Sequence, residues 1–442
     1  MTAEVAILNK LAVALAADST VTISSAEEKH KTFESADKLF ELSATQPLGV
    51  MFFGDGHYMD MPVGVLVKEF RRKRLDFNTV SEARDSFLSY LQTIGKDSPS
   101  KLKVEHTLAH ILPFLNMVFE GAFSDLQKVA LESFKRSSDG EYESEIDSDQ
   151  VYLSAVRRRI LTLTHFLEGR EDAAFVGGEA PKRLTKALTE SILSNVERAE
   201  IAKSGEIDDL VLKVSRLLIR KDTPDGSPSG LVFAGFGEDE IFPSMHSCMI
   251  DGFIRGKLKY RHTQFCDIDR MDRSAAVYGF AQRDVLERFL YGFDGATRKH
   301  IVDVAKWGMA SYLKDVIDAL KEAGASDELV EELLKRNQSG VEEFEKTLET
   351  DGFENVVATG RNEIEDLVRF MPKPDLAEMA ESLVNLTSMK RRVSKGMETV
   401  GGPVDVAVIS KSEGFVWVKR KHYFDSKYNH RFFTRKGFGQ IG

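Results

Sequence analysis

The chain has 442 residues, of which 42% are hydrophobic and 29% are charged. These are ordinary values for a globular protein, and the length suffices for two or three domains. The formal net charge of −10 argues against a general nucleic-acid-binding protein. No run of 18 apolar residues occurs, so we expect no membrane span. The two cysteines, Cys248 and Cys266, lack the spacing of a metal site and suggest buried thiols in a reducing, cytoplasmic compartment.

The N-terminal segment 1–56 predicts β-strands. Short apolar runs are separated by polar turns, as expected for buried strands. The runs cover 5–8, 12–17, 39–42 and 49–53. We expect the first two to pair through a turn at Asn9 and Lys10.

From Pro62 onward the pattern becomes helical. Amphipathic periodicity continues through 80–94 and 102–134, and it resumes over 150–220 after an acidic loop. Strand-like runs return at Leu231, after a loop rich in proline, glycine and serine. A second helical stretch covers 281–350, and a last helix is expected at 377–395.

Thr2 and Asp18 provide the first chemical signal. Thr2 follows Met1 directly, and its small side chain favours removal of that methionine. A threonine exposed in this way carries a hydroxyl nucleophile and a free amine that can act as its base. Asp18 ends the second apolar run.

Lys38 and Gly54 provide the second signal. Residues 38–42 read KLFEL and residues 54–56 read GDG, so Lys38 begins one predicted strand and Gly54 ends the next. A lysine near the Thr2 amine would favour the neutral, proton-accepting form of that amine. The backbone N–H of Gly54 could face a developing oxyanion. The alternative interpretation is a turn-forming aspartate, a surface lysine and a tight-turn glycine.

The order and spacing of these residues resemble the proteasome β subunits and their simpler bacterial relatives, which are N-terminal nucleophile (Ntn) hydrolases. The separation of Thr2 and Asp18 is that of the family's threonine and aspartate. The resemblance resumes at 231–236, which read LVFAGF, and at 400–409, which read VGGPVDVAVI. It implies an α+β fold, specifically a four-layer αββα Ntn-hydrolase sandwich with two large helical insertions. It also implies that Thr2, Asp18, Lys38 and Gly54 are catalytic and that the first three converge.

Two positions depart from the family pattern. Counting back from the glycine pair at 401–402, the family's supporting serine falls on Val400 and its aspartate on Met397. The family's Gly-Ser-Gly turn falls near 271–274, so Asp272 or Ser274 is a candidate to replace the missing hydroxyl.

A typical β subunit is about half as long as this chain, within the usual size of one domain. The resemblance therefore divides the chain into a core and insertions, and insertions of this size would alter or cap ring assembly. The Ntn core is predicted in three parts and the helical insertions in two. The core comprises 1–90, 229–295 and 376–442 with its C-terminal tail, and the insertions are 91–228 and 296–375.

The resemblance predicts a threonine-type peptidase or amidase that acts on peptide or protein substrates. It implies no cofactor and no metal, and a homo-oligomer; whether an ATP-dependent unfoldase partner exists is left open. Neither a membrane nor a nucleic acid is expected as a partner. The alternative is a non-catalytic proteasome-like scaffold or interaction protein, which the departures at Val400 and Met397 favour.

Three other motifs give weaker signals. His106 and His110 have a helical spacing that can chelate a metal, but no third ligand is near in sequence, so we expect a polar helix face. The Gly235-Phe236-Gly237 segment is interpreted as a strand end. The basic and aromatic tail over 419–436 is expected to pack on its own domain or a neighbouring subunit, although this composition also suits nucleic acid or an acidic partner.

Overall fold

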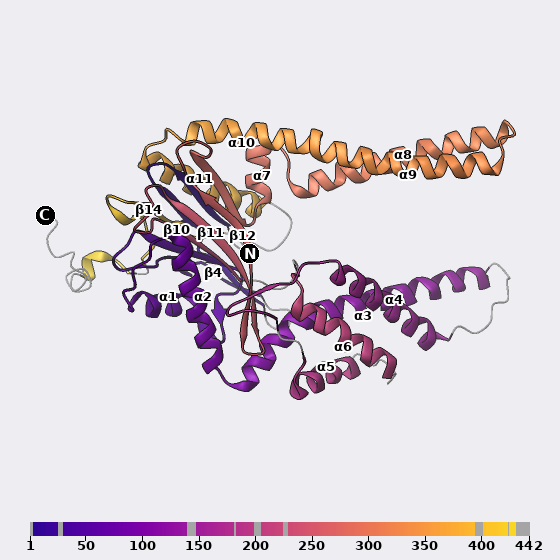
Figure 1. Cartoon of the computed structure of the whole chain (residues 1–442), viewed down its shortest axis with the longest axis horizontal. Coiled ribbons are helices and arrows are strands. Elements are labelled where there is room, and N and C mark those ends of the chain that lie inside the picture. The colour runs from indigo at the N-terminus through magenta and orange to yellow at the C-terminus, as the bar shows by residue number, and fades with distance from the viewer. Residues whose placement is uncertain are drawn as a thin grey trace. The chain divides into compact units, whose positions relative to one another are not determined.

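The computed structural model shows an α+β protein built from antiparallel sheets and many helices (Figure 1). The residues that it describes are 3–24, 30–138, 147–180, 183–198, 205–223, 229–393, 401–422 and 424–429. The chain forms two compact units, each assembled from segments distant in sequence. Unit 1 comprises Met1–Leu39, Ile241–Pro243 and Asp267–Gly442, and unit 2 comprises Phe40–Glu240 and Ser244–Cys266.

Unit 1 contains a five-stranded antiparallel sheet in the order β13-β1-β2-β14-β15. Its strands are β1 (Ala3–Asn9), β2 (Val13–Ala17), β13 (Ala275–Ala281), β14 (Asp405–Ser410) and β15 (Gly414–Lys419). The central strands β1 and β2 are buried along their whole length, which explains their continuous apolar runs. A separate two-stranded ladder pairs β3 (Val21–Ser24) with β4 (His30–Phe33).

The predicted turn between β1 and β2 is confirmed. Glu4 pairs with Ala17 and Leu8 with Val13 in an antiparallel register. The Asn9 side chain closes the turn, because its Oδ1 accepts from the backbone N–H groups of Leu11 and Ala12.

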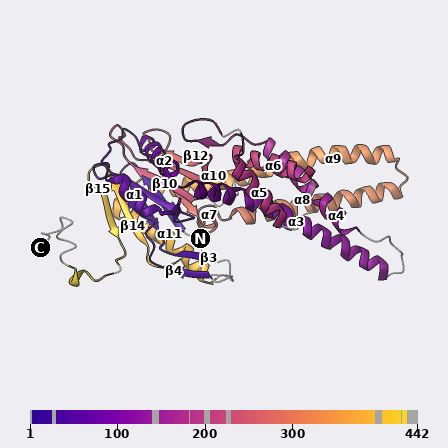
Figure 2. The same ribbon diagram turned by 90° about the horizontal axis from the view of Figure 1, so that it is seen from below.

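The helices of unit 1 cover the sheet and extend beyond it. They are α7 (Asp284–Tyr291), α8 (Gly295–Glu322), α9 (Asp327–Thr347), the π-helical turn η1 (Leu348–Glu354), α10 (Asn355–Val368), α11 (Lys373–Val393) and the short 3-10 turn η2 (Ser426–Tyr428). Helix α11 packs on β1, β2 and β14, and α10 packs on β13. Helices α8 and α9 lie side by side as a hairpin (Figures 1 and 2). Asp294 caps α8 by accepting from the Thr297 N–H.

Unit 2 contains a six-stranded sheet in the order β5-β6-β10-β11-β12-β9. Its strands are β5 (Leu39–Glu41), β6 (Leu48–Phe53), β9 (Ala174–Phe175), β10 (Ser229–Gly235), β11 (Ser244–Ile254) and β12 (Lys257–Asp267). A small ladder pairs β7 (His57–Tyr58) with β8 (Met61–Pro62). As predicted, β10 ends at Gly235, ahead of Phe236 and Gly237.

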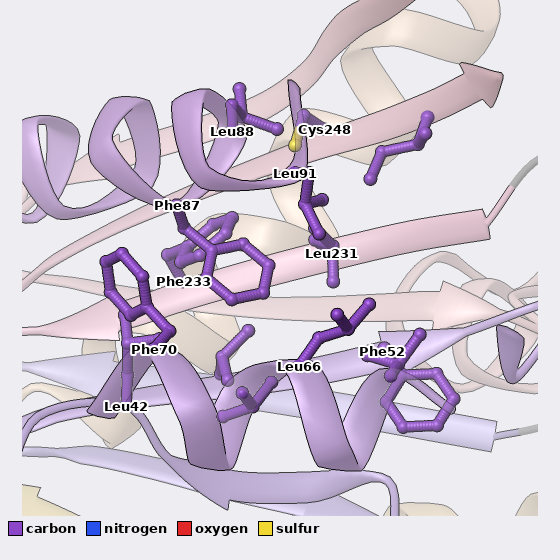
Figure 3. Close-up of a cluster of buried hydrophobic side chains, with 14 of the residues drawn as sticks. Leu42, Phe52, Leu66, Phe70, Phe87, Leu88, Leu91, Leu231, Phe233 and Cys248 are labelled. Atoms are coloured by element: carbon purple, nitrogen blue, oxygen red, sulfur yellow. The ribbon is translucent and has the colours of Figure 1, made fainter. Parts of the chain in front are cut away.

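Helices α1 (Val63–Arg71) and α2 (Val80–Asp97) bury their apolar faces in one core with the sheet of unit 2. Figure 3 shows Phe70 of α1 and Phe87 of α2 meeting Phe233 of β10. The rings of Phe70 and Phe87 pack edge to face with centroids 5.1 Å apart. Gly95 allows close approach of α2, since a Cβ there would lie 2.3 Å from the Phe253 ring.

The other helices of unit 2 form a second core. They are α3 (Ser100–Ser138), α4 (Ser148–Glu168), α5 (Lys186–Arg198) and α6 (Gly205–Arg220). Helices α3 and α4 pack side by side, and α4 also packs on α6. These helices account for most of the predicted helical stretch 91–228, and α8 to α10 account for most of 296–375. The division into an Ntn core and two insertions stays a prediction.

The helical pattern expected over 150–220 is wrong at one place. There β9 joins the edge of the six-stranded sheet, with Phe175 opposite Lys259. Helix α4 ends at Glu168 with Gly169 as its C-cap, and the helix does not continue into β9. Burial of Phe175 in the second core of unit 2 stabilises this short strand, a tertiary effect that a periodicity search does not detect.

Candidate active site

Asp18 lies in unit 1, directly after β2, and is fully buried. Antiparallel pairing with β1 places it beside the start of that strand. Its backbone N–H donates to the Ala3 carbonyl at 3.1 Å, and its Oδ1 accepts from the Ala3 N–H at 3.1 Å. The Asp18 carboxylate is therefore held at the residue that follows Thr2 in the chain.

Lys38 lies immediately before β5, and its side chain is also buried. Its Nζ donates to Asp18 Oδ1 at 2.6 Å and to the Thr20 carbonyl at 2.7 Å. The prediction that Lys38 meets Asp18 is confirmed. The attraction between these two charges offsets part of the free-energy cost of burying both of them.

The second oxygen of Asp18 is held by the glycine turn that precedes β14. Asp18 Oδ2 accepts from the Gly401 N–H at 3.1 Å and, more weakly, from the Thr20 N–H at 3.4 Å. Gly402 has φ +73°, and a Cβ on it would lie 3.0 Å from the Glu34 carbonyl oxygen. Glycine is therefore needed at 402, where the turn approaches the 34–38 segment that carries the lysine.

A second ion-pair group supports the same region. Asp405, the first residue of β14, is buried and pairs in register with Ala17. Its carboxylate accepts from the backbone N–H of Lys421 at 2.9 Å and also contacts the Lys421 Nζ. That Nζ lies 3.6 Å from an oxygen of Asp37, next to Lys38. The C-terminal tail at Lys421 therefore packs on its own unit, which is one of the arrangements expected from the sequence.

The other predicted site residues differ in their placement. Thr2, Met397 and Val400 lie outside the described residues. Gly54 follows β6 in unit 2, where it is exposed and has φ +90°. Asp18 and Lys38 are the two predicted site residues that the structure brings into contact.

Asp272 and Ser274 lie in the loop before β13. Asp272 is exposed and Ser274 is half-buried. The backbone N–H groups of Met271 and Asp272 both donate to Asp269 Oδ1 at 2.7 Å. These N–H bonds, above all that of Asp272, lower the pKa of Asp269. The loop is thus organised around Asp269, and the supporting role of Asp272 or Ser274 stays a prediction.

Sequence reasoning missed two contributors to this site. The Thr20 carbonyl and the Gly401 N–H are backbone groups, and no residue-type motif identifies backbone partners. The glycine pair at 401–402 was the available signal for Gly401. Glycine pairs mark tight turns, and the backbone N–H groups of such a turn can face a carboxylate.

The expectation of a polar helix face at His106 and His110 is wrong for His110. That residue is buried, and its Nε2 lies 3.0 Å from the Nζ of the buried Lys259. Desolvation, followed by the Lys259 charge, lowers the pKa of His110 to about 3. The apolar residues around His110 on α3 were a signal that this face is buried.

No protein-family model matches the chain, and no curated protein matches it. Within the ranges that the structure describes, no three histidine, cysteine or carboxylate side chains are grouped to hold a metal ion. No helix among the described residues has the length and apolar character needed to span a bilayer.

The site in unit 1 holds a buried, oriented lysine that can influence a neighbouring amine. It presents a buried ammonium, held by Asp18 and the Thr20 carbonyl, beside the start of β1. Two of the three Lys38 N–H donors are accounted for by these bonds. A positive charge near an amine favours the neutral form of that amine, and the bond to Asp18 orients the lysine.

Proposed function

We propose that the chain is a proteasome-like N-terminal threonine hydrolase, a peptidase or amidase. Thr2 would be the nucleophile, and its α-amine would be the base. The proposal requires cleavage of the peptide bond before Thr2, because only a free amine can accept the hydroxyl proton.

The buried contact between Lys38 and Asp18 at the N-terminus of β1 carries this proposal. Asp18 Oδ1 bonds both Lys38 and the N–H of Ala3, whose nitrogen is covalently attached to Thr2. Covalent geometry keeps Thr2 within a few ångströms of that nitrogen, since consecutive Cα atoms are about 3.8 Å apart. A lysine placed there favours a neutral threonine amine near neutral pH.

A purely structural role for the Lys38–Asp18 ion pair accounts less well for the arrangement around Asp18. Buried ion pairs often contribute little net stability compared with apolar residues of similar volume. Three separate segments nevertheless meet at Asp18: the start of β1, Lys38 and the turn at Gly401. A catalytic group at the start of β1 would need neighbours that are held in place, and this convergence supplies them.

The finer architecture that we propose is the four-layer αββα sandwich. Each unit taken by itself contains one antiparallel sheet with helices packed against it, α11 in unit 1 and α2 in unit 2. In this proposal the Gly54 N–H supplies the oxyanion donor, a contribution worth about 2.7–4 kcal/mol in studied enzymes. Peptide or protein substrates and a homo-oligomeric assembly belong to the same proposal.

The test is hydrolysis of a panel of fluorogenic peptides and amides. Thr2→Ala should abolish turnover and leave the fold intact, because one hydroxyl is lost and no ion pair is broken. The matched control is Thr162→Ala, at an exposed threonine of α4, which should keep wild-type turnover. Equal turnover in Thr2→Ala and wild type would refute Thr2 as the nucleophile.

A non-catalytic scaffold is the second candidate. The α8–α9 hairpin exposes large apolar residues, with Trp307 73% and Tyr312 72% exposed, which is typical of surfaces that bind other proteins. The valine and methionine at 400 and 397 also favour it. Wild-type protein that neither turns over any substrate nor reacts at Thr2 would support this candidate over the hydrolase.

A further inference from the structure

Unit 2 contains a small cavity between β11, the β7 segment and helix α3. Its volume is about 130 Å³, and its lining includes His57, Tyr58, His106, His110 and Asp251. The proposed hydrolase chemistry in unit 1 uses none of these residues. A water molecule occupies about 30 Å³ of liquid, so the cavity has room for a group of several heavy atoms.

Asp251 is the unusual member of this lining. It lies in β11, is 8% exposed, and neither of its carboxylate oxygens has a hydrogen-bond partner among the described residues. Desolvation raises the pKa of Asp251 to about 6. Buried carboxylates are normally paired or hydrogen-bonded, so two unsatisfied oxygens facing a cavity indicate a missing donor.

The buried cation Lys259 does not supply that donor. Lys259 Nζ donates to the carbonyl oxygens of Leu218 and Lys221 at 2.9 and 2.8 Å, and it lies 3.0 Å from His110 Nε2. Two of the three protons of the ammonium are thus donated to backbone carbonyls, away from Asp251. Lys259 therefore acts on Asp251 only through its field, and no ion pair joins them among the described residues.

His110 contributes no charge to the cavity at neutral pH. Its Nε2 lies 3.0 Å from both the Lys259 Nζ and the Leu218 carbonyl oxygen. Desolvation, followed by the Lys259 charge, holds its pKa at about 3. The formal charge that faces the cavity from its buried walls is that of Asp251.

The side chains that line the cavity indicate which class of ligand it binds. Two unpartnered oxygens on one carboxylate match the two parallel N–H groups of a guanidinium, which binds carboxylates in a bidentate manner. A divalent metal fits less well, because the described residues group no three metal-ligating side chains. Tyr58 offers no donor, since its hydroxyl donates to the Leu91 carbonyl at 3.2 Å.

We propose that this cavity binds a guanidinium group, with Asp251 as its counter-ion. The group belongs either to a free small molecule or to the arginine side chain of a peptide. The size of the cavity suits a guanidinium with a short alkyl stem. This inference does not rest on the proposed hydrolase, because it uses residues of unit 2 alone.

Binding should strengthen as pH rises through the titration of Asp251, since the carboxylate must be charged to hold the cation. The other titratable and charged groups near the cavity are Asp55, His57, His106, Asp222, Lys259 and Arg261. Desolvation lowers the pKa of Lys259 to about 8, so its repulsion of a cation declines at higher pH.

The test is calorimetric titration of the full chain with methylguanidinium chloride, with potassium chloride at equal ionic strength as the blank. Wild type should bind at pH 7.5, and Asp251→Asn, which keeps the shape and removes the charge, should bind at least about tenfold more weakly. Asp209→Asn, at an exposed aspartate of α6, is the matched control and should bind as wild type does.

A second variant tests the cavity without altering its charge. Ala109 lies at the exposed rim, and Ala109→Phe should block entry and reduce binding by a similar factor. A capped arginine amide that binds as well as methylguanidinium would identify a peptide side chain as the source, and binding by methylguanidinium alone would identify a free small molecule. Absence of wild-type binding, equal binding by Asp251→Asn, or Asp251-dependent binding of zinc in preference to guanidinium would overturn the proposal.

Discussion

Replacement of Lys38 by methionine is the sharpest perturbation of the unit 1 site. Lys38→Met keeps most of the side-chain volume and removes the charge, so Asp18 is left as a buried carboxylate without its cation. Breaking a buried ion pair by removing one partner typically costs about 3–5 kcal/mol.

The contacts that remain place the cost at the lower end of that range. Asp18 keeps the N–H groups of Ala3 and Gly401 at 3.1 Å and a weaker bond from Thr20, while the Thr20 carbonyl loses its lysine donor. We expect a loss of about 3 kcal/mol in the free energy of unfolding. For a unit of about 200 residues this corresponds to a fall of about 6–12 °C in melting temperature.

Scanning calorimetry at neutral pH measures this change. The matched control is Lys299→Met, at an exposed lysine of α8, which should change the free energy of unfolding by less than about 0.5 kcal/mol. Peptide hydrolysis by Lys38→Met should fall together with stability, because the Thr2 amine would hold its proton more tightly. A melting temperature for Lys38→Met equal to that of the control would refute the buried ion pair and, with it, the role given to Lys38.

Two further predictions concern stability. Asp251 has its pKa raised from 3.8 to about 6, so its contribution to stability falls as pH rises through that interval and stays lower above it. Asp251→Asn should therefore stabilise the ligand-free protein at pH 7 by up to about 3 kcal/mol and flatten the pH dependence, which urea unfolding at pH 4 and pH 7 measures. A less stable variant at pH 7 would contradict this sign. Gly402→Ala should cost about 2–3 kcal/mol, because positive φ is combined with close approach to Glu34, whereas Gly414→Ala, with positive φ and open space, should cost about 1 kcal/mol. Equal costs in thermal unfolding would show that the approach at Gly402 is relaxed in solution.

The sequence was most informative where one physical rule decided the structure. The apolar runs that became β1 and β2 are buried on all sides, and Asn9 supplies ordinary turn chemistry. The contact of Lys38 with Asp18 was implied by the resemblance to a known family, since neither residue type alone indicates a buried pair.

The remaining features depend on partners that are distant in sequence. Phe175 forms a strand because it pairs with β12 and is buried in the second core of unit 2, and His110 is buried because Lys259 and the end of α6 meet it. Asp251 is exceptional because no described residue forms a hydrogen bond with its carboxylate, and this is visible only in three dimensions. Periodicity and motif spacing describe a residue's neighbours along the chain and do not reveal such contacts.

The role of Thr2 is tested by the intact mass of the purified protein, before and after treatment with an electrophile that reacts with N-terminal threonine. We predict a chain that begins at Thr2 and gains one equivalent of the electrophile, with no gain in Thr2→Ala. A chain that retains Met1, or one that begins at Thr2 and gains no mass, would contradict the proposal that Thr2 is an activated nucleophile.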